Sequence, residues 1–177
     1  MPRLFTGLEI PPAVVAELSA YRGGLHGARW VEPENYHITL RFIGDIDDAL
    51  ARDLIDALGE ARPRNPIQVT LDGLSAFGGG KPRSVHARAK ATPELADLHA
   101  EQERLVSRVG LEPEGRKFKP HMTLARLRGT SAADVARWLA ERPFAPLVFP
   151  VERVVLYSSR ASTGGGPYAI EAAYPFA

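Results

Sequence analysis

The chain of 177 residues contains no cysteine, which excludes disulfide bonds and catalytic or metal-binding thiolates. Long apolar runs are also missing, and none approaches the roughly 20 residues that a membrane span requires. The first residues, Met1 to Gly7, do not form the apolar segment of a secretion signal. These absences predict a soluble, cytoplasmic protein whose chemistry uses groups other than thiols.

A strong excess of charge is absent as well, because the formal net charge is only +1. This balance argues against a protein that coats long nucleic acids, since such binding requires many simultaneous phosphate contacts. Of the 22 basic residues, however, 18 are arginine, the side chain best shaped for bidentate phosphate binding. A GC-rich genome would produce the same bias. Recognition of a single phosphate or of a strand end stays open.

The periodicity of apolar residues predicts both strands and helices without strict alternation, which favours an α+β fold. The apolar content of 45% can fill the core of one compact domain, residues 1–177, built of two lobes. Strands are predicted at 3–10, 28–31, 36–43, 67–74, 84–90, 121–127, 147–157 and 168–174, the last two separated by a flexible loop, Ser162–Gly166. Helices are predicted after Pro11-Pro12, over 45–58, from a Thr92 cap to about Val109, and after a capping box formed by Ser131 and Asp134.

The chain contains a weak internal repeat. His37–Gly44 aligns with His121–Gly129, and each copy is a predicted strand followed by a glycine and a helix. A duplicated unit of this kind predicts two pseudo-symmetric lobes, each an antiparallel-rich sheet with helices on its outer face, enclosing a central cleft. The cleft between the lobes is then the candidate site.

Each copy of the repeat begins with a His-x-Thr-Leu motif. Average residue frequencies make two such motifs among five histidines a chance of roughly one in several thousand. Alternate residues of a strand share a face, so His37 projects with Thr39, and His121 projects with Thr123. The intervening Ile38, Leu40, Met122 and Leu124 are predicted to enter the core.

Two imidazoles on either side of a phosphodiester suit in-line displacement. One accepts a proton from the attacking oxygen while the other donates a proton to the leaving oxygen, near neutral pH. Threonine hydroxyls can hold the non-bridging oxygens as negative charge builds up. This chemistry requires no metal or other cofactor.

The segments Pro33–Gly44 and Phe118–Arg126 resemble the signature segments of the 2H phosphoesterase superfamily. The nearest branch comprises the RNA 2′,3′-cyclic phosphodiesterases, also called 2′-5′ RNA ligases. Arg3–Pro11 and Val155–Ser159 resemble that branch too, so the similarity covers nearly the whole chain.

This resemblance implies hydrolysis of an RNA 3′-terminal 2′,3′-cyclic phosphate to a 2′-phosphomonoester, without a cofactor. It implies that His37 is the proton donor to the 3′-oxygen and that His121 is the proton acceptor that activates water. The residues by themselves do not distinguish the two roles. Some relatives also join RNA ends through a 2′-5′ bond without ATP. The expected partner is an RNA end, such as that of a tRNA fragment, and the expected state is a monomer without membrane association.

Further substrate contacts are predicted less directly. Arg126 fits the resemblance, but it lies an odd number of residues from His121, so only a bulge would bring it to the phosphate. Phe5, Phe118 and Tyr168 are candidates for stacking on the terminal base, with core packing as the alternative. The basic loop Arg116–Lys119 is a candidate contact for the RNA backbone, with a solvated surface loop as the alternative.

The remaining histidines are treated differently. His86 stands where relatives commonly have a tryptophan, which puts base contacts from that strand in doubt but not the phosphate chemistry. His26 and His99 have no threonine partner and are predicted to be structural.

Other functions fit parts of the sequence. Gly78-Gly79-Gly80-Lys81 is no phosphate-binding loop, because Pro82 stands where a Ser or Thr is required. A metal hydrolase would need three or more clustered ligands, and neither histidine motif has a second ligand nearby in sequence. An RNA-end-binding module without turnover and an enzyme acting on small cyclic nucleotides or cyclic phosphates of ADP-ribose stay open.

Overall fold

The computed structural model describes residues 3–159 and 167–177. Within them the order of elements is β1 (Arg3–Glu9), α1 (Pro12–Ser19), β2 (Ala28–Trp30), a 3-10 turn (Pro33–Asn35), β3 (His37–Asp45), α2 (Asp48–Leu58), β4 (Ile67–Phe77), β5 (Ser84–Ala89), α3 (Pro93–Arg108), β6 (His121–Leu127), α4 (Ala132–Ala140), β7 (Leu147–Val151), β8 (Arg153–Ser159) and β9 (Tyr168–Pro175). No helix among these is long and apolar enough to span a membrane. The predicted loop Ser162–Gly166 lies outside the described residues.

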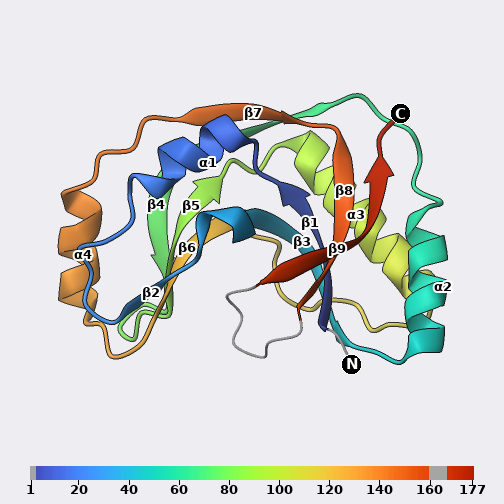
Figure 1. The fold of residues 1–177 in the computed structure, drawn as a ribbon, viewed down its shortest axis with the longest axis horizontal. Helices are drawn as coiled ribbons and strands as arrows, with labels where there is room; N and C mark the ends of the chain where they lie inside the picture. Colours follow the sequence, from blue (N-terminus) through green and yellow to red (C-terminus); the bar gives the residue numbers. More distant parts are fainter. Residues whose placement is uncertain (1–2, 160–166) are drawn as a thin grey trace.

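The strands form one antiparallel sheet in the order β7-β4-β5-β6-β3-β1-β8-β9, with β2 paired to β6 as an additional strand. The sheet has two parts that meet at β6 and β3, where Ile38 pairs with Met122. We call β2, β4, β5, β6 and β7 the His121 lobe, and β1, β3, β8 and β9 the His37 lobe. Figure 1 shows them side by side, with β4, β5 and β6 on the left and β1, β3 and β9 on the right.

The helices cover one face of the two lobes, as the sequence predicts. Helices α1 and α4 place Val14, Leu18, Val135 and Trp138 in a core cluster with residues of β4, β5 and β6. A second cluster joins Leu54 and Leu58 of α2 and Leu105 and Val106 of α3 to Leu4 and Leu156 of the His37 lobe. Because the apolar contacts hold the helices on this face, the opposite face of the sheet is left for the site.

The two lobes have equivalent strand orders, since β6, β5, β4 and β7 correspond to β3, β1, β8 and β9 counted outward from the junction. The lobes are nevertheless not contiguous halves of the chain. From β1 the chain enters α1, which packs on the other lobe, and it returns in β3; α3 likewise extends from the His121 lobe over the core of the His37 lobe. The predicted pseudo-symmetry is therefore present in an interleaved form.

The prediction of one strand over 147–157 was wrong. The segment forms β7, which pairs with β4, and β8, which pairs with β1, and the chain passes between the lobes at Glu152. The carbonyl of Glu152 accepts a hydrogen bond of 2.8 Å from the backbone N–H of Phe176. Pro150 and the charged pair Glu152-Arg153 interrupt the apolar run at this point, and the prediction of a single strand did not take account of them.

Local signals in the sequence set the helix starts. Thr92 and Ser131 accept hydrogen bonds from the backbone N–H groups of Leu95 and Asp134, at 3.2 and 3.1 Å, which confirms the two predicted caps. Asp47, two residues after the predicted start, caps α2 through the N–H of Leu50.

Candidate active site

The four residues of the two His-x-Thr motifs surround the junction of the lobes. Ile38 and Met122 pair there, and both side chains are fully buried. Because successive strand residues point to opposite faces, the flanking His37, Thr39, His121 and Thr123 project to the face away from the helices. All four are partly buried. The structure thus brings together the residues that the motifs predicted.

His37 is held by two polar contacts and an aromatic surround. Its Nδ1 lies 2.8 Å from the carbonyl oxygen of Asn35, and its Nε2 lies 3.0 Å from Oγ1 of Thr39. A carbonyl only accepts, so Nδ1 carries the proton in the neutral ring, and the Thr39 hydroxyl donates to Nε2. The rings of Phe5, Tyr157 and Tyr168 lie with centroids 4.9, 5.6 and 5.1 Å from the imidazole.

His121 is fixed in the same way. Its Nδ1 lies 2.6 Å from the carbonyl oxygen of Lys119. Lys119 stands two residues before His121, just as Asn35 stands two residues before His37. The Nδ1 atoms therefore donate to the main chain, which leaves Nε2 of each ring as the nitrogen that could exchange protons with another group. The His121 ring packs edge-on against Phe77 and His86, with centroids 4.8 and 5.0 Å away. His86 in turn stacks on Phe77 at 4.2 Å.

Both active-site imidazoles have lowered pKa values. The pKa of His37 is lowered to about 4, chiefly by burial and also by the charges of His121 and Arg126, against the hydrogen bond to Asn35, which raises it. Burial and the charge of Arg126 likewise lower the pKa of His121, against the raising effect of its bond to Lys119. Without a bound anion, both rings are therefore predominantly neutral at pH 7.

A bulge in β6 brings Arg126 to the site. The register of β5 and β6 passes from Val85–Ala125 to His86–Thr123, so Leu124 has no partner on β5. Beyond this extra residue the alternation is reversed, and Arg126 lies on the same face as His121. Strand β3 has the same bulge at Leu40, which places Phe42 at the equivalent position.

The position of Arg126 is evident from its electrostatic effects. Its charge lowers the pKa values of both histidines, and its side chain hydrogen-bonds to Tyr168, whose phenol pKa burial raises. Arg126 thus faces both imidazoles. The sequence argument allowed this position only if the strand contained a bulge, and β6 contains one.

The other predicted stacking residues fall into two groups. Phe5 and Tyr168 lie against His37 and against each other, with centroids 5.1 Å apart. Phe118 instead stacks on His99 of α3, at 3.9 Å and nearly parallel, and packs against the main core. The structure does not bring Phe118 to the histidine pair, because the loop before β6 turns this ring toward the helix face. His99 packs in a structural setting, as predicted.

Several residues beside the histidines were not predicted. Phe77, His86 and Tyr157 contact the two rings, and His86 is only 3% exposed. Strand alternation could place His86 on one face of β5, but its neighbour across the sheet depends on the bulge in β6. No local sequence pattern gave that register.

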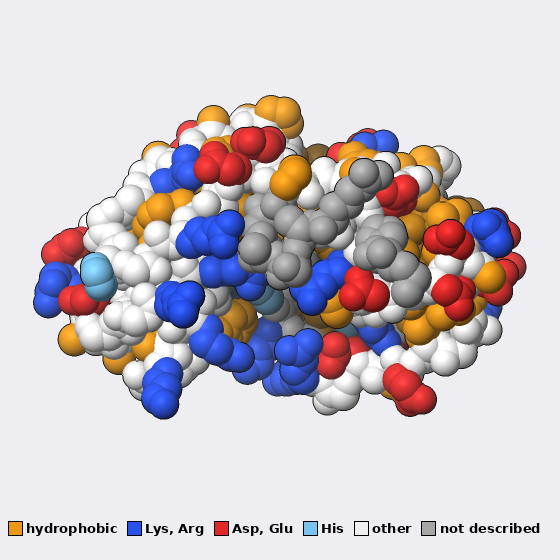
Figure 2. Space-filling view, turned by 60° about the horizontal axis from the view of Figure 1, so that its bottom comes forward, with side chains coloured by type: hydrophobic (Ala, Val, Ile, Leu, Met, Phe, Trp, Pro, Cys, Tyr) orange, Lys and Arg blue, Asp and Glu red, His pale blue; other side chains and the backbone are white. Residues whose placement is uncertain are grey.

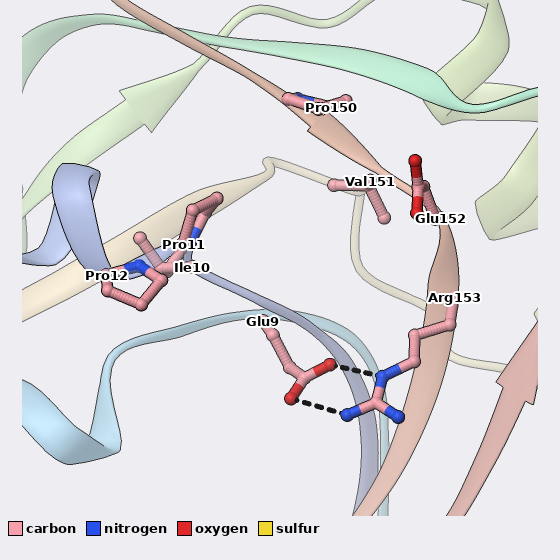
Figure 3. A pocket seen from close by; sticks show the side chains of 8 residues that line it. All are labelled: Glu9, Ile10, Pro11, Pro12, Pro150, Val151, Glu152 and Arg153. Carbon is pink, nitrogen blue, oxygen red and sulfur yellow. Dashed lines mark hydrogen bonds and ion pairs between the residues drawn. The ribbon is translucent and has the colours of Figure 1, made fainter.

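A separate pocket of about 390 Å³ lies where the chain passes between the lobes, and none of its lining residues is a histidine. Figure 3 shows Glu9 and Arg153 in it, joined by two bonds of 2.6 and 2.9 Å. Among residues 3–159 and 167–177, no group of three His, Asp or Glu side chains is arranged to hold a metal ion. The histidine pair lies outside this pocket, at the junction of β3 and β6.

Comparison with known families identifies the chain. The sequence model that describes the 2′-5′ RNA ligase superfamily matches residues 10–163 of this chain. The chain belongs to this superfamily. The resemblance of its two histidine motifs to that family is therefore confirmed.

Relatives within the 2′-5′ RNA ligase superfamily carry the name RNA 2′,3′-cyclic phosphodiesterase. A protein of Aeropyrum pernix is 39% identical over 101 residues, which cover 56% of this chain and 57% of the relative. A protein of Bacillus subtilis is 32% identical over 130 residues, 71% of each chain. A protein of Aquifex aeolicus is 32% identical over 149 residues, 80% of this chain and 78% of the relative.

Solved structures of other proteins share the fold over nearly the full chain. A Thermus thermophilus protein, 25% identical, superposes with a TM-score of 0.79 over 98% of this chain and 97% of its own. E. coli LigT in complex with 3′-AMP, 24% identical, gives a TM-score of 0.79 over 99% and 98%. These matches confirm the predicted α+β fold with an antiparallel sheet.

Proposed function

We propose that this protein hydrolyses an RNA 3′-terminal 2′,3′-cyclic phosphate to a 2′-phosphomonoester. The observation that carries the proposal is the pair of histidines at the Ile38–Met122 junction, each with Nδ1 tied to a main-chain carbonyl. The activity in the names of the relatives supports it. Both lobes act as one functional unit, since each supplies one histidine.

In the proposed reaction, His121 is the base. Its neutral Nε2 accepts a proton from water while the water oxygen attacks phosphorus and the bond from phosphorus to the 3′-oxygen breaks. Protonated His37 donates the Nε2 proton to the leaving 3′-oxygen. The product carries a 2′-phosphate and a 3′-hydroxyl, and proton exchange with solvent restores both rings. The family resemblance assigns these roles.

The lowered pKa of His37 adds a condition to this mechanism. A ring with a pKa of about 4 is unprotonated in the free protein at pH 7. A bound cyclic phosphate brings a negative charge beside it, which favours the imidazolium and offsets the charge of Arg126. Substrate binding thus raises the pKa of His37, and the ring takes up from solvent the proton that it later donates.

The remaining site residues bind the phosphate. Thr39 and Thr123 offer hydroxyls on either side of the junction, and Arg126 offers a guanidinium that faces both histidines. Such donors stabilise the charge that develops on the non-bridging oxygens. Phe5 and Tyr168 line the His37 side, where a ribose or base would lie. With an RNA 5′-hydroxyl in place of water as the nucleophile, the bond from phosphorus to the 3′-oxygen still breaks, and the product is a 2′-5′ phosphodiester formed without ATP.

The experiment is the hydrolysis of a short RNA with a 2′,3′-cyclic phosphate end, in EDTA, with the phosphate position identified by NMR. A 2′-phosphate formed in EDTA is the expected result. A 3′-phosphate, or turnover only with added metal, would contradict the mechanism. Turnover of small cyclic nucleotides but not of the RNA would move the function to those substrates, and binding of RNA ends without turnover would make the protein a binding module.

A further inference from the structure

We propose that a basic strip beside the candidate site binds the RNA backbone on the 5′ side of the cyclic end. The strip consists of Arg29, Lys81, Arg83 and Arg128 and adjoins Arg126. It would make the protein prefer oligonucleotide ends to mononucleotides. This inference deepens the proposed function and rests on it for the position of the cyclic phosphate.

The register of the sheet places Arg29 next to Arg126. Ser84 of β5, Arg126 of β6 and Arg29 of β2 are partners in one row across three strands. Partners in a row project to the same face, and neighbouring strands are about 4.8 Å apart. Because Arg126 faces the histidines, Arg29 lies on the same face, on the side of β6 opposite β5. It extends the cationic surface away from the reacting phosphate.

Main-chain contacts gather the other three cations at the same end of the His121 lobe. The N–H of Arg128 donates to the carbonyl of Gly27, next to β2, at 3.0 Å. The carbonyl of Arg83 accepts from the N–H of Leu127 at 2.8 Å. Lys81 lies in the turn between β4 and β5, where its N–H donates to Gly78 at 3.0 Å. All four side chains of the strip are exposed.

These four cations are not neutralised by neighbouring carboxylates. In the part of the chain that the structure describes, Arg29, Lys81, Arg83 and Arg128 form no ion pair, whereas many other arginines do, among them Arg62, Arg64, Arg88, Arg108, Arg137 and Arg153. Figure 2 shows Lys and Arg side chains gathered around the middle of the face that it views. In a protein of net charge +1, such a group marks a binding surface for anions.

The chemistry of the opposite lobe determines where the backbone would run. Along the same face, the His37 lobe has Phe42, which is 46% exposed, and Tyr168, which packs with the buried rings of Phe5 and Tyr157 around His37. An aromatic surface suits a nucleoside, whereas an arginine row suits phosphates. With the cyclic phosphate between the histidines, the phosphates of the preceding nucleotides would therefore follow Arg126, Arg29 and Arg128.

The test compares substrates of different length. Rates of hydrolysis are measured for a 2′,3′-cyclic mononucleotide and for RNAs of two, four and eight nucleotides with the same cyclic end. The variants are Arg29→Gln, Arg128→Gln and the double variant. Arg52→Gln, an exposed arginine on α2 without an ion pair in the described residues, is the matched control.

We expect kcat/KM of the wild type to rise with the first one to three added nucleotides. The double variant should lose about tenfold in kcat/KM on the octanucleotide and retain the wild-type value on the mononucleotide. The dependence of log(kcat/KM) on log salt should also become shallower, by about 0.7 for each phosphate contact removed from a single strand. The Arg52→Gln control should match the wild type on every substrate.

A kcat/KM that is independent of length, or an equal loss on mononucleotide and octanucleotide, would overturn the inference while leaving the proposed function intact. If no substrate is hydrolysed, a binding measurement still tests the basic strip separately from the proposed function. Fluorescence anisotropy with a labelled octanucleotide ending in a 2′-phosphate should then still show about tenfold weaker binding to the double variant. Equal binding of this RNA by the wild type and the double variant would overturn the proposed role of the strip in RNA binding.

Discussion

Ile38 and Met122 face each other where β3 meets β6, and neither side chain is exposed to solvent. This pair closes the core under the site, and the two histidines and two threonines beside it point the other way. Core residues and candidate site residues therefore alternate along these parts of β3 and β6. Substitutions at the histidines and threonines should change activity with little effect on stability.

The first prediction concerns the two histidines. His37→Ala and His121→Ala should each lower kcat by about 10²–10⁴-fold, the usual contribution of general acid or base catalysis. The melting temperature by circular dichroism should stay close to that of the wild type. His26→Ala, at an exposed position, is the control and should keep full activity. An unfolded variant, or one with the wild-type rate, would remove these residues from the proposed site.

The second prediction concerns the pH dependence of catalysis. The reactive form needs one proton, on His37, and folding lowers the pKa values of both histidines below 6.5. Above pH 6.5, kcat/KM should therefore fall about tenfold for each pH unit, because the free protein loses that proton. The alkaline limb of kcat should lie at higher pH, since the bound phosphate raises the pKa of His37. A kcat/KM that rises between pH 6.5 and 8 would contradict this mechanism.

The third prediction separates two effects of Arg126. Arg126→Gln should reduce kcat/KM by about 10²-fold, because one donor to the phosphate is lost. The same change should move the alkaline limb of kcat/KM to higher pH, because the charge of Arg126 lowers both histidine pKa values. Arg126→Lys, which keeps the charge, should restore the wild-type limb. A reduced rate with an unmoved limb would show that Arg126 does not act on the histidines.

The fourth prediction concerns stability in acid. Burial lowers the pKa of His86 to about 4, so between pH 6.5 and 4 the unfolded chain binds protons that the folded protein excludes. Stability should thus fall as the pH falls through this window, by at most about 1.4 kcal/mol per pH unit for each such histidine. His86→Phe, which keeps a ring against Phe77, should show a smaller loss in urea unfolding at pH 5 relative to pH 7.5. The same loss in both proteins would contradict the buried, neutral state of His86.

The fifth prediction concerns Gly7, on β1 beside the site. A Cβ atom at this position would lie 2.8 Å from the carbonyl oxygen of Ile38 and 3.2 Å from the Tyr157 ring. Gly7→Ala should lower the free energy of unfolding by about 1–3 kcal/mol, since the backbone of β3 has to move. Gly115→Ala, where no atom lies within 4 Å, should change it by less than about 0.5 kcal/mol. Equal stability of both variants would show that β1 and β3 are not packed this closely.

Sequence periodicity was sufficient for the parts of the site that depend on one strand. The spacing of His37 and Thr39, or of His121 and Thr123, decides by itself which side chains share a face. The caps at Thr92 and Ser131 were predictable for the same reason, because each involves residues only three apart. The repeat in turn predicted the two equivalent lobes.

Features that depend on pairing between distant strands were not predictable. The bulge at Leu124 decides that Arg126 faces the site and that His86 lies opposite Thr123, but it exists only in the register with β5. The break at Glu152 depends on β7 and β8 pairing with different strands. Phe118 was a candidate for base stacking until α3 placed His99 beneath its ring.

The interleaved connection of the lobes has a consequence for biosynthesis. Residues 3–9 form β1, which lies between β3 and β8, and β8 comprises residues 153–159. While the chain emerges from the ribosome, the His37 side stays an incomplete sheet with an open strand edge until residues 153–159 are made. Pairings of such long sequence separation form slowly and expose the nascent chain to aggregation. The His37 lobe should therefore depend more on chaperones during synthesis than the His121 lobe.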